Sequence, residues 1–289
     1  MVKALFKTMR PRQWTKNAFL FAALVFDGKL FHLNDFLRTL AGFGLFCLIS
    51  SAVYIFNDLL DVESDRQHPV KKNRPIASGK LPVPIAMVAG SVLVLFTLSA
   101  GYILAWRFAS TLLVYFTMML AYSKWLKHIL ILDVLILAAG FVLRVHAGTT
   151  LIVVERFSPW LYVLMTLLAL YLGFGKRRAE LSLLAQAATS HRQVFEGYTI
   201  PLLDQFITIV SGTTIVAYSL YTFFRPAAPE SLMLTIPFVV YAIFRYLYLV
   251  QVKKIGGEPE EILLTDRPLQ ISIMMWGMAI LAVFYLSVP

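Results

Sequence analysis

Long apolar segments recur along almost the whole chain, with short polar connections between them. Each approaches the roughly 20 residues that a helix needs to cross a bilayer, and their predicted bounds are 17–33, 37–58, 83–105, 108–123, 129–150, 158–175, 205–224, 232–250 and 269–288. The first is the weakest, because Asp27-Gly28-Lys29 interrupts it. The strict alternation of apolar and polar residues that is typical of membrane barrels does not occur in them. The pattern predicts an all-α polytopic membrane protein with nine transmembrane helices in a single domain over residues 1–289.

The basic residues predict the orientation. Most of the 26 Lys and Arg residues fall in the N-terminal tail and in the connections after the second, fourth, sixth and eighth helices. These alternate connections lie on one face, which the positive-inside rule assigns to the cytoplasm. We therefore expect a multi-pass protein of the cell membrane with a cytoplasmic N-terminus and an external C-terminus. Because the longer connections are cytoplasmic, an active site should open to that side.

Composition agrees with this picture. The chain is 59% hydrophobic, has a mean hydropathy of +0.73 and carries only 15% charged residues, where a soluble domain has about 25%. The topology alone accounts for the net charge of +10, so no nucleic-acid partner is expected. The single cysteine, Cys47, excludes an intrachain disulfide. The basic N-terminal stretch leads into an apolar segment with no small-residue cleavage site, which favours an uncleaved first helix over a signal peptide.

Acidic residues gather where the second predicted helix ends. Asp58, Asp61 and Asp65 are spaced i, i+3 and i+7, which places them on one helix face. Three carboxylates at a membrane helix end repel one another unless a cation neutralises them. Oxygen ligands suit a hard cation such as Mg²⁺, which prefers one or two carboxylates together with substrate phosphates. The predicted metal ligands are Asn57 and these three aspartates.

A basic run follows this acidic cluster. Its members are Arg66, Lys71, Lys72 and Arg74. Carboxylates for a metal beside cations for phosphate are the arrangement that a bound diphosphate needs. Two plainer interpretations stay open: a solvated acidic helix end, and structural ion pairs between the acidic and basic residues.

A second polar group accompanies the fifth predicted helix. Asp133 begins this helix, and Arg144 follows eleven residues later on nearly the same face. An acid and an arginine inside a membrane helix are functional candidates by default. Tyr122, Ser123 and Lys127 precede them in the sequence. Tyr122 is equally consistent with an interfacial aromatic residue.

The stretch from Asn57 to Asp65, with Arg74-Pro75 and Gly79 after it, resembles the NDxxDxxxD and RPxxxG motifs of the UbiA-type intramembrane prenyltransferase superfamily. This resemblance implies nine transmembrane helices around a central cavity, with two Asp-containing motifs that bind Mg²⁺ and a diphosphate. The second motif commonly has two aspartates, whereas here only Asp133 is present, which argues against a second complete Mg²⁺ site. The same resemblance implies that Lys127 contacts a phosphate of the substrate.

Three further stretches resemble one branch of that superfamily, the decaprenyl-phosphate phosphoribosyltransferases. They read MRPRQWTKN, DVESDRQHPVKKNRPIASG and GKRRAEL. In prenyl-donor members an Arg-Thr pair more often stands where this chain has Lys72-Asn73. The resemblance implies that 5-phosphoribosyl 1-diphosphate is the donor and that a polyprenyl (decaprenyl) phosphate lipid is the acceptor. The product would supply precursors of cell-wall arabinan.

The resemblance also implies roles for individual residues. The expected catalytic residues are Asp58, Asp61, Asp65, Lys127 and Asp133. The expected substrate-binding residues are Lys16, Asn57, Arg66, Lys71, Arg74, Tyr122, Ser123, Arg144, Lys176 and Arg177. The 5-phosphate of the sugar needs extra cations, for which the candidates are Arg10, Arg12, Lys16 and the Lys176–Arg178 cluster; positive-inside topology explains the same residues equally well. We place Glu180 and Tyr198 in the connection after the sixth helix, where they would cap the cavity.

Two other functions share parts of this pattern. A prenyltransferase that moves a prenyl group from a polyprenyl diphosphate to an aromatic acceptor would use the same metal residues. A transporter would instead place its ionisable residues near the middle of the membrane. In this chain the charges gather at one face, and Arg144 is the main exception. A homo-oligomer is compatible with the sequence.

Overall fold

The computed structural model describes residues 1–155, 158–187, 197–224, 229–253 and 259–285. Within these ranges every regular element is a helix and no strand occurs, which confirms the all-α prediction. The chain divides into two compact units. The first contains residues 1–127 and 143–155, and the second contains residues 128–142 and 156–289.

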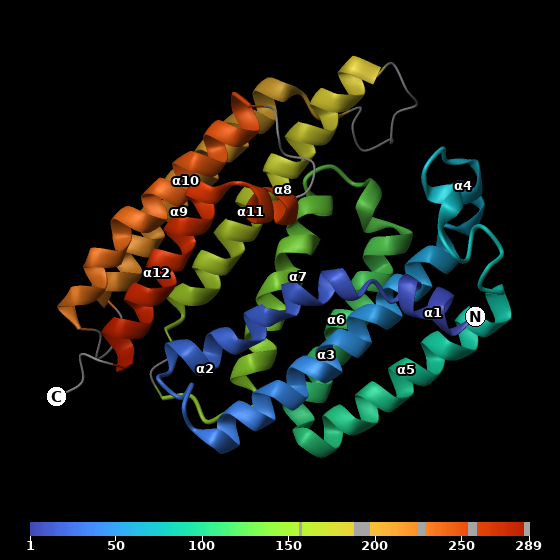
Figure 1. Cartoon of the computed structure of the whole chain (residues 1–289), viewed down its shortest axis with the longest axis horizontal. Coiled ribbons are helices and arrows are strands. Elements are labelled where there is room, and N and C mark those ends of the chain that lie inside the picture. The colour runs from blue at the N-terminus through green and yellow to red at the C-terminus, as the bar shows by residue number, and fades with distance from the viewer. Residues whose placement is uncertain (156–157, 188–196, 225–228, 254–258, 286–289) are drawn as a thin grey trace. The chain divides into compact units, whose positions relative to one another are not determined.

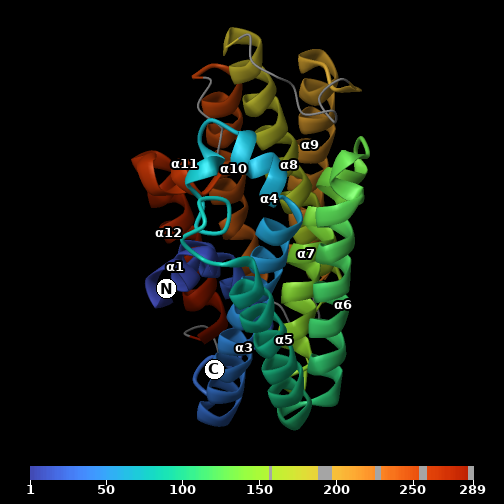
Figure 2. The same cartoon turned by 90° about the vertical axis from the view of Figure 1, so that its right-hand side faces the viewer.

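Three long helices, α3 (Leu33–Leu60), α5 (Val83–Leu104) and α6 (Trp106–Lys124), pack side by side in the first unit (Figures 1 and 2). The N-terminal segment lies along α3. It consists of α1 (Val2–Thr8), the 3₁₀ helix η1 (Pro11–Phe21) and α2 (Ala22–Phe26). Two short elements follow α3, namely α4 (Val62–Gln67) and the 3₁₀ helix η2 (Lys71–Asn73).

The second unit is built mainly from α8 (Trp160–Ala187), α9 (Ile200–Phe224), α10 (Ile236–Gln251) and α12 (Arg267–Tyr285). The pairs α8 with α9 and α10 with α12 make its most extensive contacts (Figure 1). Shorter elements complete it, namely η5 (Glu230–Thr235) and α11 (Pro259–Thr265). Helix α7 (Leu132–Thr149) belongs to the second unit up to residue 142 and to the first unit from residue 143, and the short η3 (Leu126–His128) precedes it.

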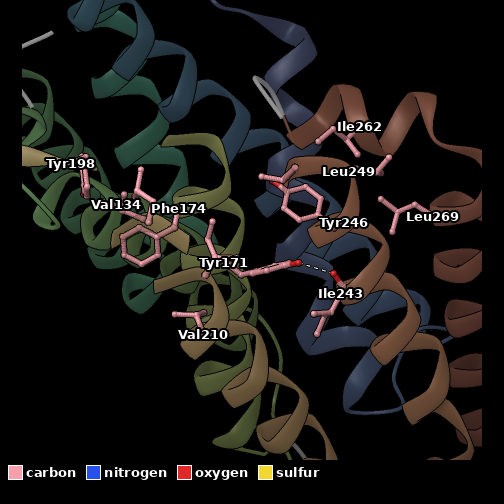
Figure 3. Packing of buried hydrophobic residues seen from close by; sticks show 13 residues of the cluster. Val134, Tyr171, Phe174, Tyr198, Val210, Ile243, Tyr246, Leu249, Ile262 and Leu269 are labelled. Atoms are coloured by element: carbon pink, nitrogen blue, oxygen red, sulfur yellow. Dashed lines mark hydrogen bonds between the residues drawn. The ribbon is translucent and has the colours of Figure 1, made fainter. Parts of the chain in front are cut away.

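Aromatic packing holds α8 against α10 in the core of the second unit (Figure 3). The hydroxyl of Tyr171 donates to the carbonyl of Ile243 at 2.6 Å, and its ring lies 5.2 Å from that of Tyr246. Gly175 allows this approach, because a Cβ there would lie 2.8 Å from the Tyr246 hydroxyl. A buried tyrosine needs such a partner for its hydroxyl, so this pairing fixes the register between the two helices.

Six of the described helical segments are long and apolar enough to cross a membrane. They are α3, α5, α7, α9, α10 together with η5, and α12. Helices α6 and α8 cover the positions predicted for the fourth and sixth spans. The number of nine spans and the orientation of the termini stay predictions.

Two predicted bounds were wrong. Residues 17–33 do not form one helix: η1 ends at Phe21 and α2 at Phe26. Gly28 follows with φ +78°, a left-handed conformation that glycine adopts without steric penalty. Helix α8 runs on to Ala187 instead of ending near residue 175. Glu180 and the 176–178 cluster therefore lie on a helix and not in a connection.

Candidate functional site

The end of α3 and the start of α4 carry the first acidic motif in the first unit. Asp58 lies in the last turn of α3 and Asp65 lies on α4, and both are buried, at 2% and 3% exposure. Asp61 joins the two helices as the C-cap residue of α3. Asn57 precedes Asp58 on α3 and is partly exposed. Burial of this kind requires that each carboxylate have a partner.

Arg74 joins two of the aspartates. Its Nη1 donates to Asp58 Oδ1 at 3.1 Å and to Asp65 Oδ2 at 2.6 Å. This single nitrogen thus lies within hydrogen-bond distance of two carboxylate oxygens, one on α3 and one on α4. The three aspartates do not lie on one face of a single helix as predicted, because α3 ends at Leu60 and Asp65 lies on α4; it is Arg74 that brings Asp58 and Asp65 together.

The loop that carries Arg74 is anchored to α3 and α5. Ile76 and Leu81 are fully buried against Ile55 and Ala86. The N–H of Leu81 donates to the Pro75 carbonyl at 2.9 Å, so the chain folds back on itself. Gly79 makes this turn with φ +75°, which explains physically why the Arg-Pro pair is followed by a glycine.

The other two cations come from distant parts of the first unit. Arg10 Nη2 donates to Asp58 Oδ1 at 2.6 Å, and its guanidinium lies over the Tyr54 ring at 4.7 Å. Lys127 Nζ donates to Asp61 Oδ1 at 2.6 Å, and this lysine is only 8% exposed. Asp61 therefore pairs with Lys127 while the other two aspartates share Arg74.

Arg10 is held in place by the residues around it. It adopts φ +53° immediately before Pro11, at the start of η1. Trp14 Nε1 donates to Ser51 Oγ at 3.0 Å, and Ser51 Oγ donates to the carbonyl of Met9 at 3.2 Å. These contacts fix the N-terminal segment against α3, and sequence spacing did not reveal them.

Within the described residues, no group of three or more His, Cys, Asp or Glu side chains is close enough to hold a metal ion. The carboxylates of Asp58 and Asp65 do converge, on the Nη1 atom of Arg74. Mg²⁺ is usually bound by one or two carboxylates together with substrate phosphates, so this donor set fits it when a diphosphate supplies the remaining oxygens. Three aspartates face three protein cations here, which leaves the cluster close to neutral.

The structure gives the following positions to the other residues that were predicted to bind substrate or the 5-phosphate. Arg66 is exposed and pairs with Glu63 at 2.9 Å. Lys71 is exposed on η2, and Arg12 is exposed on η1. The others lie within helices: Lys16 (part-buried) on η1, Tyr122 (part-buried) and Ser123 (buried) on α6, and Lys176 (part-buried) on α8.

Arg144 lies in a separate buried cluster of the first unit. Its Nε donates to Asn17 Oδ1 and its Nη2 donates to the Tyr115 hydroxyl, both at 2.8 Å. The guanidinium also lies over the rings of Tyr115, at 4.9 Å, and Phe46, at 5.5 Å. With 6% exposure, Arg144 links α7 to η1, α3 and α6.

Asp133 is the centre of a buried group in the second unit. It is fully buried, its Oδ2 accepts from Arg177 Nε at 2.7 Å, and its Oδ1 accepts from the Tyr198 hydroxyl at 2.8 Å. Arg177 Nη1 also donates to Glu180 Oε2 at 2.5 Å. Burial first, and then the hydrogen bond to Asp133, raise the pKa of Tyr198, so its hydroxyl stays protonated and can donate. Tyr198 contacts Asp133 directly, a role that we did not foresee from the sequence.

Arg178 makes different contacts from the adjacent Arg177. Its guanidinium contacts both oxygens of Asp204, at 2.5 and 3.3 Å, and donates to the Val250 carbonyl at 3.1 Å. Gln251 Nε2 donates to the same carboxylate at 3.1 Å. These contacts tie α8 to α9 and α10, so within the 176–178 cluster we assign Arg178 to helix packing. The arginine and its aspartate are 26 positions apart in the chain, and no sequence motif connects them.

Comparison with known proteins supports the resemblance seen in the sequence. Residues 18–176 match the UbiA prenyltransferase family. A protein of Mycolicibacterium smegmatis named decaprenyl-phosphate phosphoribosyltransferase is 35% identical over 99% of this chain and 94% of its own length. One of the same name from Corynebacterium glutamicum is 31% identical over 99% of this chain and 88% of its own length.

Solved structures agree on the fold. A UbiA homolog from Archaeoglobus fulgidus, solved with DMAPP and Mg²⁺, has a TM-score of 0.71 at 18% identity, covering 97% of this chain and 98% of the homolog. A digeranylgeranylglyceryl phosphate synthase has a TM-score of 0.70 at 14% identity, covering 98% of both chains. From its motifs, its fold and these relatives, the chain belongs to the UbiA prenyltransferase family.

Proposed function

We propose that this chain is a decaprenyl-phosphate phosphoribosyltransferase that depends on Mg²⁺. It would transfer the 5-phosphoribosyl group from 5-phosphoribosyl 1-diphosphate to a polyprenyl phosphate and release diphosphate. The observation that carries the proposal is the buried cluster in which Arg10, Arg74 and Lys127 meet Asp58, Asp61 and Asp65. It supplies carboxylates for a divalent cation and guanidinium and ammonium groups for phosphates at the same place. Near-full-length relatives with this name support the choice of substrates.

In this proposal the three aspartates and Asn57 would hold Mg²⁺ together with the substrate's oxygens, and the metal would supply Lewis-acid stabilisation of the leaving diphosphate. Arg74, Arg10 and Lys127 are already oriented on the aspartates and would donate to diphosphate oxygens. An oxygen of the lipid phosphate attacks C1 of the ribose, the bond from C1 to the diphosphate breaks, and the diphosphate leaves with the bonding electron pair. Cations placed where negative charge accumulates lower the barrier for such a step. The lipid phosphate is already anionic near neutral pH, so no general base is required.

The proposal includes a membrane setting. Nine helices would cross the cell membrane, with the N-terminus and the acidic cluster on the cytoplasmic side, where a water-soluble sugar diphosphate is available. The lipid acceptor would reach the site from the bilayer. The product would serve as a precursor for cell-wall arabinan.

The donor distinguishes this function from aromatic prenylation. Membranes that contain the protein should convert labelled 5-phosphoribosyl 1-diphosphate and polyprenyl phosphate into a labelled lipid with Mg²⁺, and should not do so when the metal is chelated. The double variant Asp61→Asn/Asp65→Asn should form no product, because it lacks two of the proposed ligands. Asp35→Asn, at the other end of α3, is the matched control and should keep wild-type activity.

The competing function has one observation in its favour, because the fold is shared with a protein solved with DMAPP and Mg²⁺. If the membranes prenylate an aromatic acceptor and form no phosphoribosyl lipid, the assignment of substrates is wrong. If the double variant keeps its turnover, the metal site is wrong whichever donor is used.

A further inference from the structure

One face of α3 contacts the N-terminal segment at three successive positions. Ser51, Tyr54 and Asp58 follow one another at intervals of three and four residues within α3, so they lie on one face of this helix. Ser51 contacts the segment through hydrogen bonds, Tyr54 through its ring and Asp58 through an ion pair. Both α1 and η1 pack on α3 (Figure 1). The helix that ends in the acidic motif therefore also holds the segment that carries Arg10.

Arg10 adopts a backbone conformation that other contacts have to enforce. Its φ of +53° is uncommon for a residue other than glycine, and such a conformation persists only where its surroundings determine it. Ser51 Oγ accepts the N–H of Trp14 Nε1 at 3.0 Å and lies 3.2 Å from the Met9 carbonyl. The same hydroxyl lies 2.7 Å from the Cys47 carbonyl on its own helix. Ser51 thus anchors the chain immediately before Arg10 and four residues after it.

This anchoring brings a second guanidinium to an oxygen that already has one. Arg10 Nη2 and Arg74 Nη1 both donate to Asp58 Oδ1, at 2.6 and 3.1 Å. A carboxylate oxygen has two lone pairs, so a divalent cation that binds through this oxygen has to displace one of the two donors. The positive charge of Arg10 also repels such a cation. Arg10 therefore competes with a metal ion for Asp58, both by occupying the oxygen and by its charge.

We propose that Arg10, positioned by Trp14 and Ser51, opposes the binding of a divalent cation alone and makes cation binding depend on a diphosphate. The inference rests on the proposed function, in which Arg10 donates to diphosphate oxygens. A bound diphosphate brings negative charge that attracts the guanidinium and the cation together, so the two no longer compete for one carboxylate oxygen. Metal and diphosphate then bind cooperatively, each raising the affinity for the other by the same factor.

The test measures two affinities of the purified protein in nanodiscs. One is the affinity for Mn²⁺ alone, a cation that also prefers oxygen ligands, measured by electron paramagnetic resonance of the free ion. The other is the affinity for labelled inorganic diphosphate at saturating Mg²⁺, measured by equilibrium dialysis. Arg10→Ala should raise the first and lower the second, each on the order of tenfold, because it removes a charge-assisted contact.

The positioning role is tested with Trp14→Phe and Ser51→Ala. The first keeps an aromatic ring but removes the indole N–H, and the second removes the hydroxyl that accepts it. Each should shift the two affinities in the same directions as Arg10→Ala but by only about threefold, because each variant loses neutral hydrogen bonds and leaves the guanidinium in the chain.

Trp276→Phe is the matched control. Trp276 Nε1 donates to the Tyr218 hydroxyl at 2.8 Å, so this variant loses the same kind of hydrogen bond outside the N-terminal segment. It should lower the melting temperature and leave both affinities unchanged. General destabilisation weakens the binding of both ligands, whereas a displaced Arg10 strengthens the binding of one and weakens that of the other.

Three results would overturn the inference. They are an unchanged Mn²⁺ affinity in Arg10→Ala, a lower affinity for both ligands in Trp14→Phe and Ser51→Ala, and a wild-type protein that binds no Mn²⁺ even with diphosphate present. Only the third result also removes the metal site of the proposed function. If the assignment of substrates is wrong instead, the wild-type protein makes no phosphoribosyl lipid, while the binding measurements still apply because both candidate donors carry a diphosphate.

Discussion

Arg74 contacts two buried aspartates with one nitrogen, and this geometry predicts the effect of its replacement. Arg74→Ala leaves Asp65 without this cation and Asp58 with Arg10 alone. We expect kcat/KM for the donor to fall on the order of 100-fold, as for the loss of a preorganised donor to a developing negative charge. Arg74→Lys should be intermediate, because an ammonium lacks the planar, forked donors of a guanidinium. Steady-state kinetics with varied donor concentration measure both effects.

Lys80→Ala is the control for these variants, since Lys80 is an exposed cation in the same loop. It should behave as the wild type. Equal losses in Lys80→Ala and Arg74→Ala would mean that the loop acts through its overall charge and not through the contacts of Arg74.

At the scale of residues, the sequence was a better guide to the polar side chains of the candidate site than to the partners with which they pair. The aspartate spacing predicted one helix face for Asp58, Asp61 and Asp65, but the helix breaks at Asp61 and Asp65 lies on α4, so Arg74 joins Asp58 to Asp65 where periodicity alone does not. Lys127 reaches Asp61 across 66 positions, and such pairings depend on how distant segments pack. The contacts of Tyr198 and Asp204 were recognised only in the structure for the same reason.

At the scale of elements, Gly148 on α7 marks a close approach within the first unit. A Cβ at this position would collide with the carbonyl oxygen of Leu20 on η1, and backbone cannot move aside as a flexible side chain can. Gly148→Ala should therefore lower the free energy of unfolding by about 1–3 kcal/mol, the usual effect of overpacking. Thermal unfolding in detergent provides the measurement.

Gly44→Ala on α3 is the comparison, because no atom lies within 4 Å of a Cβ there. Alanine is the better helix former, so this variant should be as stable as the wild type or slightly more stable. If Gly148→Ala unfolds at the same temperature as Gly44→Ala, α7 and η1 are not in close contact.

The bounds of the helices show where periodicity is informative. Uniformly apolar segments such as α5 and α10 were predicted to within a few residues. The prediction failed where a helix continues past its apolar part, because α8 extends through charged residues as far as Ala187. Good helix-forming residues in that extension support it, but hydropathy alone does not detect them.

At the scale of the whole molecule, the orientation in the membrane can be tested with cysteine labels. The only native cysteine, Cys47, is buried at 3% exposure and provides a background with little reactivity. Lys80→Cys and Lys253→Cys, both at exposed positions, should react with an impermeant maleimide only when the cytoplasmic face is open. Phe31→Cys, at a position that is 76% exposed, should react from outside intact cells.

Labelling of all three positions from the same side would contradict the proposed topology. Labelling of Lys80→Cys and Lys253→Cys from opposite sides would instead require a different number of crossings between them. The charge distribution predicts neither outcome, since both lysines lie in connections that the positive-inside rule assigns to the cytoplasm.

The near-neutral cluster at the end of α3 has a consequence for how the protein folds and matures. Every acidic group of the motif already has a basic partner from the same chain, so the electrostatic repulsion among the carboxylates is relieved during folding itself. Under the proposed function, folding of this part of the chain would therefore not depend on a divalent cation, and metal and substrate would bind to a cluster that is already assembled.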